Sequence, residues 1–162
     1  SITINEVNDI PVGNSQSITT NEDTTSTGTL SGSDVENSVL TFSLVTMPSK
    51  GVVILNDVHT GAFTYVPNVN ANGSDSFTFK VNDGTADSVP VVVNIQILPV
   101  NDAPVLANFG VTGLEDTTIS LTLADFTNAF SDPENDSLAS IKILSLPSTG
   151  VDRKSTRLNS RH

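Results

Sequence analysis

Cysteine and tryptophan are absent from this 162-residue chain, and aromatic residues make up only 5% of it. Without cysteine, the chain can form neither a disulfide framework nor a thiolate metal site. The only histidines are His59 and His162, so a zinc site is effectively excluded. A core is possible, but it must be built from Val, Ile, Leu and a few Phe. A small domain without disulfides therefore needs another stabilising element.

Basic residues are also scarce, with 7 Lys and Arg against 18 Asp and Glu, giving a formal net charge of −11. Such an acidic chain repels phosphate backbones, so we expect no nucleic-acid partner. No run of eighteen apolar residues occurs, and we expect no membrane insertion in this fragment. The missing initiating Met and the strand-like start at Ile2–Ile4 indicate an excised fragment. The acidity favours an extracellular or cation-binding protein.

An internal repeat organises the chain. Asn8-Asp9-Ile10-Pro11 recurs as Asn101-Asp102-Ala103-Pro104, and Glu22-Asp23-Thr24-Thr25 recurs as Glu115-Asp116-Thr117-Thr118, both at an offset of 93 residues. A fixed period of this length is typical of tandem domains. We therefore predict the end of a preceding repeat with its linker (1–10), one complete repeat (11–102), the N-terminal half of a second repeat (103–150) and a non-native tail (151–162).

The tail reverses the local charge and has no strand pattern, because it contains Arg153, Lys154, Arg157 and Arg161. Translated library-adapter sequence is the favoured interpretation. A genuine basic extension that binds an acidic surface is the alternative.

Alternation of apolar and polar residues predicts half-buried antiparallel strands at Leu40–Leu44, Phe77–Val81 and Val91–Ile97. A hairpin is expected between Gly51–Leu55 and Ala62–Val66, and weaker strands at 16–20 and 27–32. About seven strands in about ninety residues indicate an all-β, Greek-key β-sandwich. The second copy is a truncated form of the same fold, with an insertion near 124–130. No stretch has helical periodicity.

Strands that alternate in direction place successive loops at opposite ends of a sandwich. The polar loop residues then sort into two clusters, one at each domain junction. The upper cluster contains Asn8, Asp9, Asp34, Glu36 and Asp83. The lower cluster contains Glu22, Asp75, Asn101, Asp102, Asp132 and Glu134. Carboxylates gathered in this way repel one another unless a cation lies among them, and oxygen ligands in this number suit Ca²⁺.

The order of these motifs resembles a cadherin repeat, and more closely the bacterial cadherin-like tandem repeats of large surface adhesins, including RTX-type ones. The resemblance covers roughly residues 5–150. It is carried by Glu22-Asp-Thr, Gly28-Thr-Leu, Asp34-x-Glu36-Asn37, Leu40-Thr-Phe-Ser-Leu, Asn82-Asp83-Gly84 and Val100-Asn101-Asp102-Ala103-Pro104.

The resemblance implies a seven-stranded cadherin/Ig-like sandwich with Ca²⁺ bound between successive domains. It places Glu22 at the acid of the first turn, Asp34 and Glu36 at an acidic pair, Asp83 at a later loop acid and Asp102 in the linker. One departure matters. The Asp-Arg-Glu signature of animal cadherins is missing, and Asn70-Ala-Asn72-Gly-Ser-Asp75 stands in its place.

These observations predict a non-enzymatic, calcium-stiffened extender repeat of a bacterial cell-surface or secreted adhesin. Its partners would be neighbouring repeats in the same chain, with host or substrate-surface ligands bound through other domains. Catalysis has little support, because no Ser/His/Asp set or phosphate loop is evident. The alternative is a carbohydrate- or protein-binding sandwich module, possibly accessory to a secreted hydrolase.

Overall fold

The computed structural model describes residues 7–36, 38–114 and 117–144. The predicted tail (151–162), residues 1–6 of the predicted preceding repeat, Asn37, the repeat-motif residues Glu115 and Asp116, and residues 145–150 lie outside this part of the chain. The chain divides into two compact units, Ser1–Asn101 and Asp102–His162, which we call unit 1 and unit 2.

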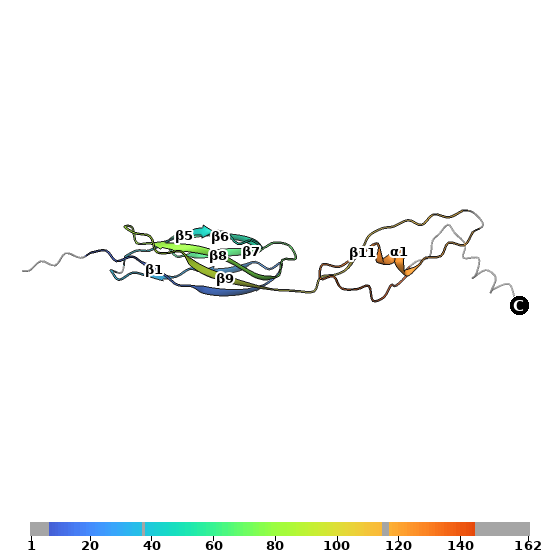
Figure 1. Ribbon diagram of the computed structural model, residues 1–162, viewed down its shortest axis with the longest axis horizontal. Coiled ribbons are helices and arrows are strands. Elements are labelled where there is room, and N and C mark those ends of the chain that lie inside the picture. The colour runs from blue at the N-terminus through green and yellow to red at the C-terminus, as the bar shows by residue number, and fades with distance from the viewer. Residues whose placement is uncertain (1–6, 37, 115–116, 145–162) are drawn as a thin grey trace, which may run out of the picture. The chain divides into compact units, whose positions relative to one another are not determined.

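Unit 1 is a sandwich of two sheets (Figure 1). One sheet has four strands in the order β2-β9-β8-β5, and the other has three in the order β3-β7-β6. A short ladder joins β1 to β4. The strand bounds are β1 Val12–Gly13, β2 Gln16–Asn21, β3 Ser26–Thr29, β4 Gly32–Ser33, β5 Thr41–Thr46, β6 Gly51–Leu55, β7 Ala62–Pro67, β8 Gly73–Asn82 and β9 Val91–Leu98.

Pairing directions determine which loops share an end of this sandwich. β2 runs parallel to β9, whereas β3–β7, β5–β8, β6–β7 and β8–β9 are antiparallel. These directions confirm the predicted alternation along the chain. The linker before β1, the β4–β5 loop and the β8–β9 loop therefore lie at one end of unit 1, and the β2–β3 turn and the β7–β8 loop lie at the other.

The core fills the space between the two sheets. Phe63, Phe77, Phe79 and Val81 are fully buried, as period-two alternation predicts for strands with one face inward. The rings of Phe63 and Phe77 meet edge to face, with centroids 5.4 Å apart. Burial of these side chains is the main source of stability in a domain that has no disulfide.

A tight hairpin joins β6 to β7 across the predicted loop. The Asp57 carboxylate accepts hydrogen bonds from the backbone N–H groups of His59 (2.8 Å) and Thr60 (3.3 Å). Gly61 has a φ of 73°, and a Cβ at this position would lie 2.7 Å from the carbonyl oxygen of Leu30. Glycine is therefore required here both by the left-handed backbone and by the close approach of the neighbouring chain.

Unit 2 contains two short strands and one helix in its described part. β10 (Val105–Leu106) pairs antiparallel with β11 (Phe130–Ser131), and α1 spans Leu123–Thr127. The helix overlaps the predicted insertion near 124–130, so the expectation of no helix was wrong. The Thr122 N–H donates to the Asp125 carboxylate at its start (2.7 Å). No helix in the described residues is long and apolar enough to cross a bilayer.

Candidate metal centre

Three segments that are distant in sequence meet at the N-terminal end of unit 1. The Asn8 amide donates a hydrogen bond to Asp83 Oδ2 (2.8 Å), which links the linker to the β8–β9 loop. The Asp9 backbone N–H lies 3.3 Å from Glu36 Oε2, which links the linker to the β4–β5 loop. The structure thus brings Asn8 to Asp83 and Asp9 to Glu36, all members of the predicted upper cluster.

Asp83 is held in an ionised state by its own loop. Its Oδ1 accepts the backbone N–H groups of Ala86 (2.7 Å) and Thr85 (2.6 Å), and its Oδ2 accepts from Asn8. These hydrogen bonds lower the pKa of Asp83, and the bond from the Ala86 N–H has the largest effect, followed by those from the Asn8 amide and the Thr85 N–H. The carboxylate is therefore negatively charged at neutral pH.

Asp34, the fifth member of this cluster, has one oxygen without a donor. Its Oδ1 accepts the Ser38 N–H (3.0 Å). Its Oδ2 is buried and has no hydrogen-bond partner among the described residues. A buried carboxylate oxygen without a donor costs free energy, and a cation is the chemical species that removes this cost. The residues at this end therefore fit a hard cation.

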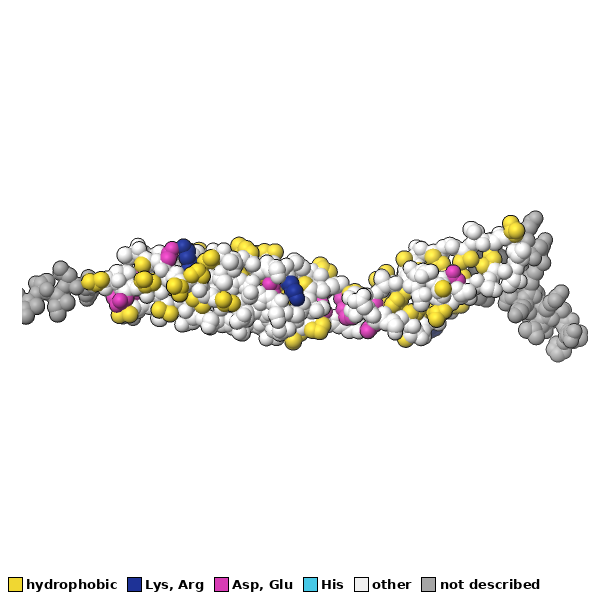
Figure 2. Space-filling view, viewed as in Figure 1, with side chains coloured by type: hydrophobic (Ala, Val, Ile, Leu, Met, Phe, Trp, Pro, Cys, Tyr) yellow, Lys and Arg dark blue, Asp and Glu magenta, His cyan; other side chains and the backbone are white. Residues whose placement is uncertain are grey.

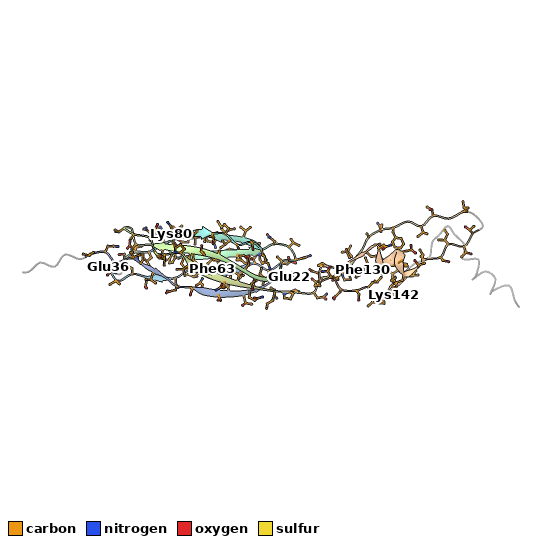
Figure 3. All side chains as sticks on the ribbon, viewed as in Figure 1. Glu22, Glu36, Phe63, Lys80, Phe130 and Lys142 are labelled. Atoms are coloured by element: carbon orange, nitrogen blue, oxygen red, sulfur yellow. The ribbon has the colours of Figure 1, made fainter. Side chains whose placement is uncertain are left out.

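Glu22, at the opposite end of unit 1, also has a buried carboxylate oxygen without a donor in the described residues. Figure 3 shows Glu22 and Glu36 at the two ends. The Glu22 side chain is only 2% exposed. Its Oε1 accepts the Val100 N–H (2.6 Å), whereas its Oε2 is buried without a hydrogen-bond partner in the described part of the chain. Nearby, Asp23 Oδ1 accepts the Asn70 N–H (3.1 Å), which joins the β2–β3 turn to the β7–β8 loop.

Asp75, which the sequence places in the lower cluster, has a set of protein donors that the sequence pattern did not indicate. Its carboxylate accepts from the Tyr65 hydroxyl (2.8 Å), the backbone N–H groups of Ser49 (2.9 Å), Lys50 (2.9 Å) and Ser76 (2.9 Å), and the Ser49 hydroxyl (3.2 Å). Burial acts to raise the pKa of Asp75, but these donors together lower it. Burial, followed by the bond to Asp75, raises the pKa of Tyr65. The role of Asp75 as a metal ligand stays a prediction.

The predicted residues of unit 2 repeat the arrangement seen at the start of unit 1. The Asp102 N–H donates to Glu134 Oε2 (3.2 Å), as Asp9 does to Glu36. Asp132 Oδ1 accepts the Glu134 N–H (3.0 Å) and the Asp136 N–H (3.1 Å), and Asp34 likewise accepts from a residue four positions further on. Asn101 is exposed at the end of unit 1, and its role in the lower cluster stays a prediction.

No group of three or more His, Cys, Asp or Glu side chains in the described residues is gathered in a way that could hold a metal ion. Carboxylates alone therefore do not make a complete shell at either end of unit 1. The amide oxygen of Asn8, backbone carbonyls and water would have to complete it, which suits a cation that accepts mixed oxygen ligands in flexible geometry.

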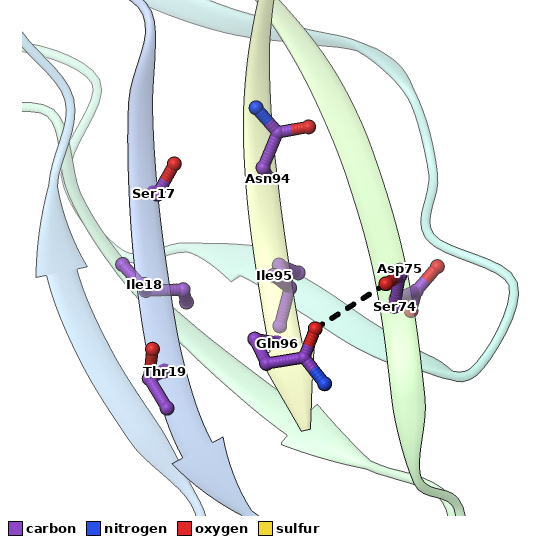
Figure 4. Close-up of a pocket in the computed structure, with 8 residues that line it drawn as sticks. All are labelled: Ser17, Ile18, Thr19, Ser74, Asp75, Asn94, Ile95 and Gln96. Atoms are coloured by element: carbon purple, nitrogen blue, oxygen red, sulfur yellow. Dashed lines mark hydrogen bonds between the residues drawn. The ribbon is translucent and has the colours of Figure 1, made fainter. Parts of the chain in front are cut away.

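A shallow hollow of about 280 Å³ lies over β2, β9 and β8 (Figure 4). Its lining is mostly hydroxyl and amide side chains, and the Ser74 hydroxyl donates to Gln96 Oε1 (3.3 Å). The full lining is Ser17, Ile18, Thr19, Ser74, Asp75, Asn94, Ile95 and Gln96. Asp75 is its sole titratable group, and that carboxylate already accepts five hydrogen bonds, so the hollow offers no general acid or base.

Comparison with solved structures finds similar domains in several proteins. An endo-fucoidan hydrolase, MfFcnA4 of glycoside hydrolase family 107, is 27% identical over 60% of this chain and 16% of its own, with a TM-score of 0.45. Human CDH23 EC21-23 is 20% identical over 64% of this chain and 40% of its own, with a TM-score of 0.47. Human mucin-like protocadherin EC1-2 is 19% identical, covering 58% and 56%, also with a TM-score of 0.47.

This chain therefore spans less than two thirds of each of these proteins, and only 15–17% of the fucoidan hydrolases. Comparison with curated protein sequences gave no match. The family model described as "Bacterial cadherin-like domain" matches residues 8–99, more than half of the chain. Domains of this kind are non-catalytic, typically extracellular and generally calcium-binding. The chain belongs to the bacterial cadherin-like domain family.

Proposed function

We propose that this chain is a calcium-stiffened structural extender of a bacterial cell-surface or secreted adhesin. Calcium binds at the ends of the sandwich and fixes the connection between neighbouring repeats of the same chain. Surface ligands of the host or substrate are bound by other domains of the full protein. Membership of a non-catalytic, typically extracellular family supports this proposal.

One observation carries the proposal. The Asp-x-Glu loop holds the linker in both units through a hydrogen bond from the linker Asp N–H to the Glu carboxylate, 3.3 Å in unit 1 and 3.2 Å in unit 2. In unit 1 the Asp of that loop also carries a buried oxygen without a hydrogen-bond donor in the described residues. An arrangement that recurs at both linkers is explained more simply by a shared ligand than by the solubility of exposed acids.

The donor set at the N-terminal end of unit 1 consists of oxygen atoms only. Asp34, Glu36 and Asp83 supply carboxylates, and the linker supplies the Asn8 amide and the carbonyl oxygens beside Asp9. Ca²⁺ accepts six to eight such ligands in flexible geometry, whereas Mg²⁺ requires a near-octahedral shell. Bound calcium would offset the mutual repulsion of these carboxylates and the unsatisfied Asp34 oxygen.

Calcium binding is coupled to folding, because these residues come from distant parts of the sequence and meet only in the native state. An affinity of roughly 10⁻⁴–10⁻³ M suffices outside a cell. At a calcium concentration ten times the dissociation constant, one site adds about 1.4 kcal/mol to the free energy of unfolding.

The test is thermal unfolding of the chain in calcium, in magnesium and in chelator. We expect calcium to raise the melting temperature of unit 1 more than magnesium does. Asp34→Asn combined with Glu36→Gln should remove most of that increase. Asp57→Asn is the control, because it removes one acidic charge from a turn outside the predicted clusters and keeps an oxygen to accept the His59 N–H. Equal melting temperatures in calcium and chelator would refute the proposal.

A second candidate function, a carbohydrate-binding module accessory to a secreted hydrolase, is favoured by the hollow on β2, β9 and β8. Its hydroxyl and amide lining suits a neutral, polyhydroxylated ligand. However, none of its lining residues is aromatic, so it offers no ring for stacking against a sugar. Binding to a glycan array that Asn94→Ala with Gln96→Ala abolishes would favour this function over the extender.

A further inference from the structure

β6 is an edge strand of the three-stranded sheet. β6 has β7 as its only partner strand in the described residues. The Asn68 N–H donates to the Lys50 carbonyl and the Asn56 N–H to the Ala62 carbonyl, both at 2.8 Å. Even-numbered residues of this segment therefore point their backbone groups toward β7. By antiparallel alternation, the N–H and C=O groups of Gly51, Val53 and Leu55 point away from the sheet.

This edge lacks the features by which proteins protect exposed strands from pairing. The strand sequence, Gly-Val-Val-Ile-Leu, contains no charge and no proline. Val52 is 55% exposed and Ile54 is 51% exposed, and Val66 lies opposite Val52 on the same face. Figure 2 shows hydrophobic side chains along the margin of unit 1 where Figure 1 places β5 and β6.

The other edge strands of unit 1 differ from β6. β5 is interrupted by a register shift between Leu44 and Thr46. β2 and β3 consist almost entirely of Ser, Thr, Asn, Gln and Gly. An irregular or polar edge pairs poorly with another chain, so β6 is the edge suited to pairing.

We propose that β6 pairs antiparallel with β6 of a second copy of this chain, joining the two three-stranded sheets into one. A two-fold axis at Val53 places Gly51 opposite Leu55 of the second copy. In this register the outward backbone groups of Gly51, Val53 and Leu55 form the hydrogen bonds. Val52 faces Ile54 of the second copy on the outer surface, so each exposed apolar side chain gains an apolar neighbour.

Charge complementarity favours this occupant and this direction, and the Lys50 ammonium also donates to the Asn72 carbonyl oxygen of its own unit (2.7 Å). Lys50 immediately precedes β6, and Asp57 follows it by two residues. Antiparallel pairing about Val53 puts Lys50 opposite Asn56 of the second copy and next to its Asp57. Parallel pairing would put Lys50 beside Lys50 and Asp57 beside Asp57. The chain carries few basic residues, so Lys50 is one of the few side chains that could attract an acidic group of a second copy.

The contact is weak for a single repeat. Five paired residues bury far less than the roughly 1,000 Å² expected of a stable interface. In a tandem array, several such contacts act together and raise the overall affinity through effective concentration. The proposal therefore describes lateral association of arrays rather than a tight dimer of one domain.

The absence of cysteine from the chain allows a test of the register. Val52→Cys and Ile54→Cys are made separately in the full chain and oxidised alone or as an equimolar mixture. In the proposed register residues 52 and 54 form a non-hydrogen-bonded pair with Cα atoms about 4.5 Å apart, within disulfide range. We expect the mixed disulfide to form well above its statistical share. A mixture that cross-links no faster than either variant alone overturns the proposal.

Sedimentation equilibrium of the full chain provides a second test. Ile54→Lys should weaken self-association about tenfold or more, because it removes an apolar contact and places like charges together. Val92→Lys is the matched control, since Val92 is 40% exposed on β9, and it should leave association unchanged. Circular dichroism checks that both variants fold. Because the contact of a single repeat is weak, we expect a dimer only at about millimolar chain concentration. A monomer at that concentration, or equal effects of the two variants, overturns the proposal.

Discussion

Unit 1 and unit 2 begin in the same way and then differ. Val12 pairs with Ser33 in unit 1, and Val105 pairs with Ser131 in unit 2. These residues are related by the same offsets as the linker and the Asp-x-Glu loop, so the two-strand ladder and the linker contact recur together. A short ladder and a hydrogen bond from the linker to the Asp-x-Glu loop are thus common to both units.

The two units differ in how they bury aromatic side chains. Phe63 and Phe77 are fully buried between the sheets, whereas Phe109, which packs edge to face against Phe126 with centroids 5.3 Å apart, is 39% exposed. The geometry of the two ring pairs is nearly equal. The difference lies in the strands that cover them, because β7, β8 and β9 supply most of the core of unit 1. Most of the core of unit 1 therefore comes from the strands that follow residue 61.

Replacing one phenylalanine in each unit tests this difference directly and gives the largest expected effect. Phe63→Ala should lower the free energy of unfolding of unit 1 by about 3–5 kcal/mol, because it leaves a cavity in a packed core. Phe109→Ala should cost about 1 kcal/mol or less, because its ring is already partly exposed. Tyr65 is the only tyrosine and reports on unit 1 alone, so its fluorescence in urea measures the first effect. The Phe109 variant should leave that transition in place, and equal shifts would contradict the comparison.

The second prediction concerns the Asp75 carboxylate, a hydrogen-bonded centre of unit 1. Asp75→Asn should cost about 2 kcal/mol, because several donors then meet a neutral group that supplies only one oxygen. Folding lowers the pKa of Asp75 below its ordinary value of 3.8. The ionised Asp75 therefore adds to the free energy of unfolding above pH 3.8, and this contribution is lost as the pH falls through the folded-state pKa.

Urea unfolding between pH 7 and pH 2, followed by circular dichroism, measures this contribution. The Asn variant should lack the part of the acid destabilisation that Asp75 causes. Tyr65→Phe is the control, because it removes one donor and keeps the charge, and it should cost about 1 kcal/mol. An unchanged pH profile in Asp75→Asn would contradict the assignment.

The strands of unit 1 could be predicted from the sequence, because each is short and alternates with period two. The strands expected at Gly51–Leu55, Ala62–Val66 and Val91–Ile97 are β6, β7 and β9. Alternating direction then placed the Asn8–Asp83 and Asp9–Glu36 pairs at one end. That step needs only the order of strands and no contact information.

Two features could not be predicted, for different reasons. α1 is a single turn, too short for apolar periodicity to show in a window of sequence. The Tyr65–Asp75 bond depends on how β7 of one sheet lies over β8 of the other, and an isolated acid on a strand gives no signal of it. A Tyr at a core position, ten residues before an acid, was the available indication.

The hydrogen bond from the linker to the Asp-x-Glu loop occurs in both units, and its residues can be replaced separately in each. At a calcium concentration ten times the dissociation constant, Asp34→Asn with Glu36→Gln should lower the free energy of unfolding of unit 1 by about 1.4 kcal/mol. Tyr65 fluorescence in urea measures this loss. Asp132→Asn with Glu134→Gln should reduce the same transition less, because these residues contact the linker of unit 2. Both pairs should have little effect in chelator. Equal losses from the two pairs would show that unit 2 controls the stability of unit 1.

The smallest effect is expected from an exposed ion pair beside the N-terminal end of unit 1. Lys80 pairs with Asp87 on the surface, where their side chains are 37% and 45% exposed. Lys80→Gln should cost less than about 0.5 kcal/mol, because water screens the pair and Asp87 keeps its hydrogen bond from the Asn82 amide (2.8 Å). Lys142→Gln in unit 2 is the control for removing one positive charge, and it should leave the Tyr65 transition unchanged. The same urea experiment in low and high salt measures both. A loss above about 1 kcal/mol for Lys80→Gln would contradict the expectation that water screens this exposed pair.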